Sequence, residues 1–426
     1  HNFEKIELIL MGGTFPSFPL DYQEEFVWGA FKAMNDFSKL FFRGGEFNLV
    51  KFKRFFELPV ENLGDKDRIT RTQKRLLKLK GKLKRGDLEL EQRKNERTKI
   101  RCVALCIETR PDYCFEKEIK QLLKLGCTRV ELGVQHLDNK VLEKIKRGHG
   151  VEETIKATKL LKDNLLKVGY HIMPGLPGSS VLKDKKMLVS LFENPAYRPD
   201  ALKIYPCMVT KGTKLYELYK KGEYRPLTTR KAAEMIAWFK ERIPEYVRVL
   251  RVQRDIPTSQ TEAGVEMTNL RQYIHETLKP KCRCIRCREP KGEQIDFGKI
   301  EIKITVYFAS EGDEVFIAAE AEDRLLGFCR LRIFEVEGQK LAGIRELHVY
   351  GTATGIGEEG TVQHRGLGKR LLQEAERIVK DNKIPKLKII SGIGARGYYL
   401  KLGYKRDGQY MSKVTEILDK RLPRHK

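Results

Sequence analysis

Short apolar segments alternate with amphipathic ones over residues 1–265. The apolar segments lie at 5–17, 100–114, 127–138, 168–180 and 201–213. Helical spacing of apolar residues follows two of them, at 115–126 and 139–148. Strands that alternate with helices predict a parallel sheet whose polar residues gather beyond the carboxyl ends of the strands. We therefore expect a partial α/β barrel here, with its chemistry at that edge.

The pattern changes at about residue 299. Residues 299–310 alternate apolar and polar side chains, and 316–334 predict two strands around a tight turn. A further strand at 344–349 precedes a helix from Leu367 on, where apolar residues recur at helical spacing. We expect a second α/β domain over 299–426, joined to the barrel by a linker at 266–298.

The start of that helix suggests a ligand, because it is preceded by the string QHRGLG, Gln363 to Gly368. Two glycines let a ligand approach the backbone, and the first N–H groups of a helix have no partner within it. Those groups and the helix dipole together favour an anion. The sequence thus predicts a phosphate-binding turn, and the alternative is a glycine-rich turn before an ordinary surface helix.

The composition indicates a class of binding partner and a cellular compartment. The 83 Lys and Arg against 58 Asp and Glu give a formal charge of +25, which favours a polyanion, nucleic acid first. A generally basic proteome or the Lys-rich surface of a thermophilic protein would give the same excess. No apolar run approaches the ~20 residues of a membrane span, and no signal peptide stands at the start. Nine cysteines without a secretion signal indicate a reducing compartment, so we expect a cytoplasmic protein with no membrane partner.

Polar strings follow four predicted strands in order. In chain order they contain Gly12, Gly13 and Thr14, then Glu108, then Glu131 and Gln135, and finally the glycines of 173–178. A structural turn would explain any one of these strings. Four of them on successive strands favour a ligand site at the edge of the barrel.

A cysteine group stands in the linker. Its members lie within six residues: Cys282, Cys284 and Cys287. Neighbouring Lys and Arg favour thiolates, and three thiolates this close suit tetrahedral zinc with one more ligand from elsewhere. We expect Cys106 as that fourth ligand, with His136 and Cys102 as alternatives. Free structural thiols would also account for the group.

A basic insertion runs from Lys66 to Arg101 between two predicted barrel strands. Its candidate nucleic-acid contacts are Lys74, Arg75, Lys78, Lys80, Lys82, Lys84 and Arg85. Each contact with a phosphate releases counterions, so the affinity should fall steeply with salt. The alternative is a solvated helical hairpin that binds nothing.

Eight strings together resemble one family. They are MGGTF, IETRPDYC, ELGVQ, RGHG, MPGLPG, NPAYRPDALKIYP, RVQRDIP and ELHVYG. They resemble the catalytic subunit of Elongator, in which a radical SAM barrel precedes a Gcn5-related acetyltransferase domain. The resemblance covers nearly the whole chain. It implies a tRNA acetyltransferase that places a carboxymethyl group on carbon 5 of the wobble uridine, with acetyl-CoA, S-adenosylmethionine and a [4Fe-4S] cluster as cofactors.

The resemblance also implies site residues. Those for acetyl-CoA are Glu346, Leu347, His348, Val349, Gln363, His364, Arg365, Gly366, Leu367, Gly368 and Tyr398. Those for S-adenosylmethionine are Gly12, Gly13, Thr14, Glu108, Glu131 and Gln135. A phenol of Tyr398 or Tyr399 would approach the thioester as an acid or hydrogen-bond donor. Tyr398 is the better candidate for the ligand, because packing in the core explains Tyr399 equally well.

The chain departs from this family at its start. The family holds its cluster on three grouped cysteines ahead of the GGTF strand, and the sequence begins with HNFEKIELIL, so nothing precedes that strand. We expect an N-terminally truncated chain that assembles no cluster. Two other functions remain open: a protein lysine acetyltransferase with a degenerate barrel, and a non-catalytic tRNA-binding scaffold. The sequence also leaves open a homodimer or Elongator-like partner subunits.

Overall fold

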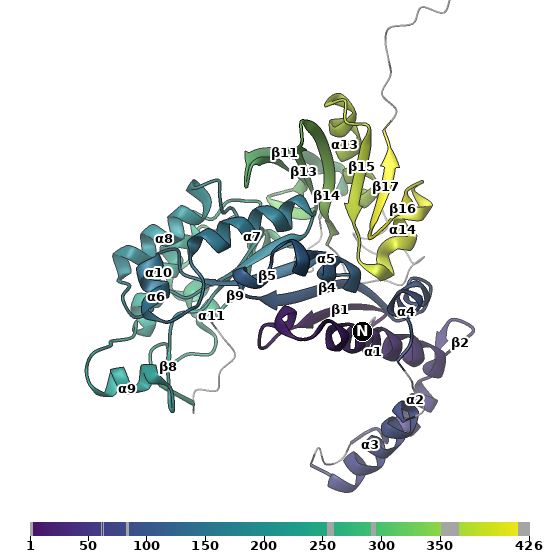
Figure 1. The fold of residues 1–426 in the computed structure, drawn as a ribbon, viewed down its shortest axis with the longest axis horizontal. Helices are drawn as coiled ribbons and strands as arrows, with labels where there is room; N and C mark the ends of the chain where they lie inside the picture. The colour runs from purple at the N-terminus through teal and green to yellow at the C-terminus, as the bar shows by residue number, and fades with distance from the viewer. Residues whose placement is uncertain are drawn as a thin grey trace, which may run out of the picture.

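The computed structural model describes residues 3–60, 62, 64–81, 85–253, 260–290, 295–350 and 366–415. Two large sheets organise them, the first lying beneath the second in Figure 1. This architecture confirms the expected α/β class, a radical SAM-type half-barrel followed by an acetyltransferase-type domain. Among the described residues, no helix is long and apolar enough to cross a membrane.

The first sheet is a half-barrel of six parallel strands. In spatial order they are β1 (Lys5–Leu10), β4 (Arg101–Thr109), β5 (Arg129–Gln135), β6 (Lys167–Ile172), β7 (Ala201–Ile204) and β9 (Arg248–Val252). The middle residues of the central strands β5 and β6 are buried on both faces, as parallel strands covered by helices require, whereas the edge strand β1 exposes Glu7 and Ile9. All six strands end at one edge, so the polar side chains near those ends come together there.

Helices connect and cover these strands. The longer ones are α1 (Leu20–Phe41), α5 (Glu116–Leu125), α7 (Val151–Asp163), α8 (Val181–Glu193) and α10 (Thr229–Lys240). The shorter ones are α2 (Leu49–Phe56), α4 (Leu88–Asn95), α6 (Asn139–Lys144), α9 (Lys214–Lys220), α11 (Leu270–Tyr273) and α12 (Ile285–Arg288). Side-chain caps fix several starts; Ser180 accepts a hydrogen bond from Lys183 N at the start of α8.

Two small antiparallel sheets and one long arm leave the half-barrel. One small sheet is the hairpin of β2 (Phe42–Arg43) with β3 (Glu46–Phe47), and the other pairs β8 (Val209–Thr210) with β10 (Thr261–Ala263), which lies beyond α9, α10 and β9 in the chain. The arm is formed by α2 and α3 (Lys66–Lys80), and it projects away from both sheets (Figure 1). The basic insertion is therefore helical over α3 and α4, and β4 begins at its last residue.

The second sheet has seven strands. In spatial order they are β11 (Glu301–Phe308), β12 (Gly312–Ala321), β13 (Arg324–Val336), β14 (Gln339–Val349), β15 (Lys386–Ile390), β17 (Tyr410–Val414) and β16 (Lys405–Asp407). Neighbouring strands are antiparallel except β14 and β15. Helix α13 (Leu367–Asp381) buries its apolar stripe on this sheet, and the short helix α14 (Arg396–Lys401) follows β15.

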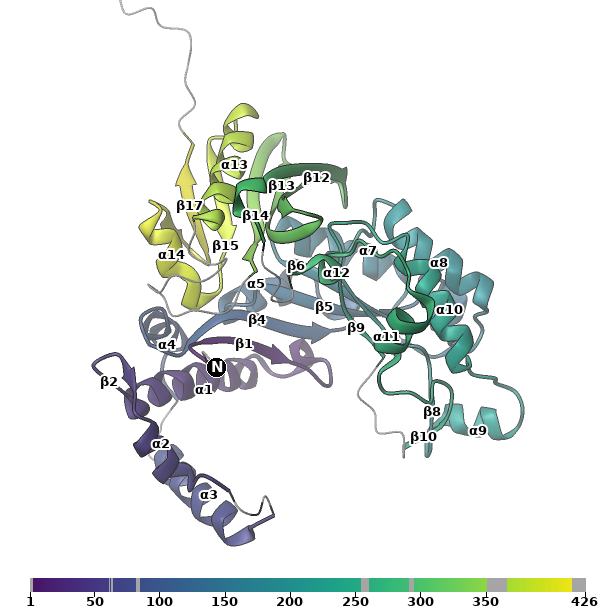
Figure 2. The ribbon, with the colours of Figure 1, turned by 180° about the vertical axis from the view of Figure 1, so that it is seen from behind.

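The two halves share a buried boundary. Arg345 of β14, fully buried, donates to both Asp200 oxygens at 2.6 and 2.7 Å and to Glu314 at 2.8 Å. Gly343 leaves room for Leu165 of the half-barrel, since a Cβ there would lie 2.3 Å from its Cδ1. Unpaired, such buried charges would cost several kcal/mol, so the pairing holds the two halves in one relative position. Figure 2 shows from behind how the two sheets lie next to each other.

Candidate functional site

Strands β14 and β15 open a gap in the second sheet. They pair over only three positions, from Ala342 to Ile344, and then separate. Arg345 is an extra residue in the pairing of β14 with β13, which bends the strand at that point. Beyond it, the segment 346–349 pairs with β13 but has no β15 partner. Over Glu346–His348, no strand of the described part of the chain pairs with that edge of the backbone, so an extended, amide-bearing ligand can add to it there.

Helix α13 begins beside this gap. Gly366 is its N-cap with φ +77°, a left-handed conformation that favours glycine. At Gly368 a Cβ would lie 3.0 Å from the hydroxyl of Tyr398 and 3.6 Å from Val349 Cγ2. The structure thus brings Gly368, Val349 and Tyr398 together, and Leu367 packs beneath them in the core. Gln363, His364 and Arg365 lie outside the described residues.

The two tyrosines of α14 have different surroundings. Tyr398 is 43% exposed and reaches the start of α13, whereas Tyr399 is 7% exposed and belongs to the core of this domain. Burial raises the pKa of both phenols, and the effect is larger for Tyr399. Both remain protonated at neutral pH, so Tyr398 can act as a hydrogen-bond donor at the gap.

Glu346 is held by charges from both halves. Its carboxylate lies 3.0 Å from Arg330 Nε and 3.4 Å from Lys167 Nζ, the latter from β6 of the half-barrel. Burial opposes ionisation, but the charges of Lys167 and Arg330 outweigh it and lower the pKa of Glu346 to about 2. Glu346 is therefore an anchor between the halves and a poor proton acceptor. The next two residues, Leu347 and His348, pair with β13.

A charged cluster occupies the inside of the half-barrel near its carboxyl edge. Glu131 Oε2 lies 2.7 Å from His171 Nε2, and Lys203 Nζ contacts Glu131 and lies 2.6 Å from Glu108 Oε1. Gly169 leaves the space that Glu131 occupies. Burial would raise the pKa of Glu131, but His171, Arg129 and Lys203 lower it below its usual range.

Only part of this cluster was predicted from the sequence. Glu108 and Glu131 lie together as expected, on neighbouring strands in register. His171 and Lys203 were missed, because each stands inside a strand and not in the string that follows it. Period-two alternation from the strand ends would have placed both on the Glu131 face.

The glycine string at the end of β1 lies at the same edge. Gly12 and Gly13 have φ of +91° and +62°, so the backbone turns sharply after the strand, and Thr14 closes the turn by accepting from Ser17. Gln135, at the end of β5, also has a positive φ of +68°. Strain at a non-glycine residue is common where side chains converge on a ligand.

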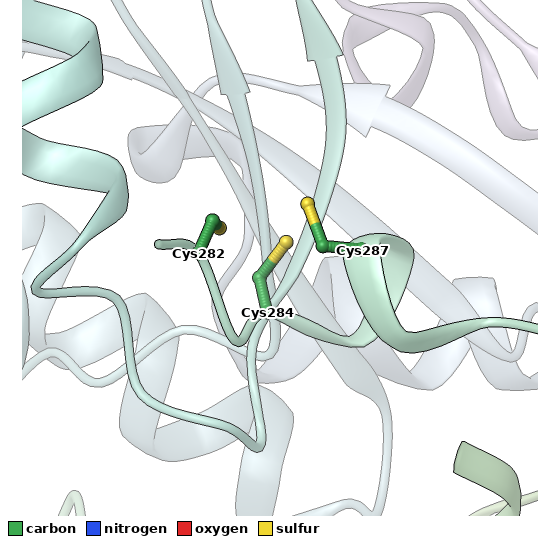
Figure 3. A group of neighbouring side chains, drawn as sticks. All are labelled: Cys282, Cys284 and Cys287. Carbon is green, nitrogen blue, oxygen red and sulfur yellow. The ribbon is translucent and has the colours of Figure 1, made fainter. Parts of the chain in front are cut away.

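The cysteine group is compact (Figure 3). The sulfur atoms of Cys282, Cys284 and Cys287 all lie within 4.8 Å of one another. Hydrogen bonds from the other two thiols and the charge of Lys240 outweigh burial and lower the pKa of Cys284. Lys240 Nζ is 3.6 Å and His275 Nε2 is 4.0 Å from Cys287 Sγ. Three thiolates with a nearby imidazole fit a tetrahedral zinc ion.

The structure corrects the expected fourth ligand. Cys106 lies on β4, where its sulfur is 3.2 Å from Arg129 Nε and 3.5 Å from Glu131. The cysteine group instead packs against the start of β9, since Ile285 N donates to Val247 O, and three strands separate β4 from β9. The alternative Cys102 is also on β4, and His136 contacts Asp184. Strand order in the sheet could not be read from cysteine spacing.

The same position tests an iron–sulfur cluster. The start of β9 is the end of the sheet opposite to the edge where Glu108 and Gly12 lie. A cluster that reduces S-adenosylmethionine must touch it, so Cys282, Cys284 and Cys287 do not fit that role. No other cysteine group able to hold a metal lies in the part of the chain that the structure describes.

The basic arm offers only part of its predicted contacts. Lys74, Lys78 and Lys80 are exposed on α3. Arg75 is held by Phe55 O at 2.6 Å and by Glu57, and Arg85 pairs with Glu24 at 3.2 Å. Lys82 and Lys84 lie outside the described residues. The arginines therefore brace the arm, and the three lysines remain available for phosphate.

Comparison with family models identifies three regions. The Radical SAM superfamily model matches residues 40–187, and the model of the Radical_SAM C-terminal domain matches 199–280. The Acetyltransferase (GNAT) family model matches 273–404. These matches confirm the order of the two halves that the sequence predicted.

Similar proteins match nearly the whole chain. A tRNA uridine(34) acetyltransferase of Methanocaldococcus jannaschii is 43% identical over 98% of this chain and 72% of its own length. Elongator complex protein 3 of Schizosaccharomyces pombe is 35% identical over 97% and 71%. The structure of archaeal Methanocaldococcus infernus Elp3 with an N-terminus deletion (1–46) has a TM-score of 0.82 and 43% identity, and the match covers 97% of this chain and 91% of that one.

Proposed function

Because this chain belongs to the family of Elongator complex protein 3 and the tRNA uridine(34) acetyltransferases, and is an enzyme that modifies the tRNA wobble position, we propose its reaction in more detail. Its two halves bind acetyl-CoA and S-adenosylmethionine, the cofactors from which carboxymethylation at carbon 5 of the wobble uridine begins. The separation of β14 from β15 beside the start of α13 carries this proposal, because it provides a seat for a coenzyme A thioester.

Each part of that seat has a chemical role. The backbone edge of Glu346–His348 pairs with the amides of the pantetheine arm, and the N–H groups at the start of α13 receive the pyrophosphate. Tyr398 stands between them with a protonated phenol, which donates to the thioester oxygen or sulfur. Glu346 keeps β14 aligned through Lys167 and Arg330.

The half-barrel receives the second cofactor. S-adenosylmethionine supplies radical chemistry when bound. Its ammonium and carboxylate groups suit the mixed charges of Glu108, Glu131 and Lys203, and the backbone of Gly12 and Gly13 lies at the same edge. The described residues offer no ligand set for an iron–sulfur cluster at that edge, so we assign no step to one.

The remaining elements serve stability and substrate binding. Zinc on Cys282, Cys284 and Cys287, with His275 as the nearest imidazole, would fix the linker to the start of β9. Lys74, Lys78 and Lys80 on the projecting α3 would bind tRNA phosphates.

Turnover of acetyl-CoA with and without tRNA tests the proposal. We expect CoA release by the chain to depend on added tRNA and to fall in the triple variant Lys74→Ala, Lys78→Ala, Lys80→Ala. Equal transfer to a lysine peptide without tRNA would instead support a protein acetyltransferase. Binding of tRNA without any turnover would support a non-catalytic scaffold.

A further inference from the structure

A cavity of about 470 Å³ lies at the mouth of the half-barrel, outside the two cofactor seats. One wall is the loop from Gly175 to Val181, which leaves the end of β6 and leads into α8. The opposite wall is the segment 223–231, which leads into α10, and Lys144 at the end of α6 closes one side. The cavity thus depends on three segments that are distant in sequence.

Three cations line this cavity. Lys144, Arg225 and Lys231 are exposed, and no ion pair involving any of them is found among the described residues. Two acids share the lining. Asp184 already accepts from Gly175 N at 2.8 Å and from Ser179 Oγ at 2.6 Å, and Glu223 is exposed. The free charge facing the cavity is therefore positive.

The rest of the lining combines apolar side chains with the hydroxyls of Ser179, Ser180 and Thr228. Leu176 and Leu227 of the lining are buried, and each is next in sequence to a proline of the lining, Pro177 and Pro226. The hydroxyl of Tyr224 donates to Gly175 O at 2.7 Å, which ties the two walls together. Cations, hydroxyls and apolar side chains on one cavity match a nucleotide unit, whose phosphate is anionic, whose sugar carries hydroxyls and whose base has flat apolar faces.

The position of the cavity relates it to the charged cluster. Gly175 follows His171 of that cluster by only four residues on the same strand-to-loop path. On the outer side, α9 adds further exposed lysines, Lys214 and Lys220, beside the cavity wall at Leu218. Figure 1 shows α9 projecting from the end of the half-barrel opposite to α3. A polyanion across this edge would meet the cavity next to the site of chemistry.

We propose that this cavity holds a backbone phosphate and its nucleotide from the anticodon loop, adjacent to the target uridine. The inference rests on the proposed function, because it needs tRNA as substrate. Lys144, Arg225 and Lys231 bind the phosphate, and the prolines and leucines contact the sugar or base. The contact fixes the strand on one side of the uridine while that base enters the half-barrel.

The test compares two double variants of equal charge in the full chain. Lys144→Ala/Lys231→Ala removes two cavity cations, and Lys117→Ala/Lys120→Ala removes two exposed lysines of α5 as the control. Binding of an anticodon stem-loop is measured from low to moderate salt. We expect the cavity variant to bind several-fold more weakly, with the slope of log K against log salt reduced by about 0.7 to 1, and the control to keep its slope.

A second probe locates the phosphate. Stem-loops carry one neutral methylphosphonate at each position flanking the target uridine in turn. One of these modified stem-loops should bind the unmodified chain more weakly than the natural stem-loop does, and the same modification should not change binding to the cavity variant. Excess inorganic phosphate should not compete with the stem-loop at matched ionic strength. The inference would be overturned if log K fell with log salt at the same slope in the cavity variant and the control variant. It would also be overturned if, at every position, each methylphosphonate weakened binding to the cavity variant as much as binding to the unmodified chain. If the unmodified chain binds no stem-loop at all, the proposed function fails together with it.

Discussion

Replacing Gly368 with alanine should separate the stability of the fold from acetyl-CoA binding. Gly368 is inside α13 and has an ordinary helical φ, so alanine favours the helix there by up to about 1 kcal/mol. The new Cβ would lie 3.0 Å from the Tyr398 hydroxyl, which is the far end of a side chain that can move. The free protein therefore stays as stable as before or becomes slightly more stable.

Binding of acetyl-CoA should respond in the opposite direction. The Cβ occupies the place where the backbone of α13 meets the ligand, and it displaces the Tyr398 phenol from the gap. We expect the Kd, measured by calorimetry, to rise at least about tenfold, or about 1.4 kcal/mol. A valine should abolish binding.

Gly29→Ala provides the matched control. Gly29 lies inside α1 with nothing within 4 Å of its Cβ position, so the same helix gain should occur without any change in Kd. If Gly368→Ala and Gly29→Ala bind acetyl-CoA equally well, α13 does not begin at the coenzyme A seat.

Four further outcomes are expected. Tyr398→Phe should lower tRNA-dependent CoA release by about 10²-fold or more with little change in acetyl-CoA Kd, and Tyr399→Phe should keep its activity. Glu346 has a folded pKa of about 2 against about 4.3 unfolded, so its contribution to stability is complete above about pH 5 and is lost as the pH falls towards 2. Glu346→Gln should flatten that acid limb in chemical denaturation, and an unchanged limb would contradict the assignment. Metal analysis should find about one zinc per chain. The double variant Cys284→Ser/Cys287→Ser should lose this zinc and have a lower Tm. If the variant retained its zinc, the metal would be bound elsewhere. Anaerobic reconstitution with iron and sulfide should yield no deoxyadenosine from S-adenosylmethionine, and its formation would show that the cysteines present do hold a working cluster.

The fold could be predicted because its periodicities are local. Parallel strands such as β4 contain a long apolar run, Cys102–Ile107, and α13 has a sharp apolar stripe, so each element was visible within its own segment. The start of α13 was predicted for the same reason. Its glycines stand next to the helix that they open.

Other features depend on how the elements assemble. Cys106 seemed a suitable zinc ligand because strand order across the half-barrel does not follow from cysteine spacing, and β4 lies three strands from the linker. Lys203 and His171 became visible only once the register paired them with each other and placed both on the face of the sheet that carries Glu131. Arg75 illustrates a similar limit, because its charge predicted nucleic-acid binding while its folded position ties it to Glu57.

Strand β4 connects the two seats physically. Near its start, Gly392 approaches so closely that a Cβ would lie 1.9 Å from Val103 O, and the loop that contains Gly392 leads directly into α14 and Tyr398. At its other end β4 carries Glu108 in the charged cluster. A rigid strand thus sets the distance between the thioester seat and the half-barrel, and packed interfaces of this kind resist continuous deformation. The reacting groups must therefore meet by movement of the bound ligands across the buried boundary, because the two halves themselves are held by Arg345, Asp200 and the glycine contacts.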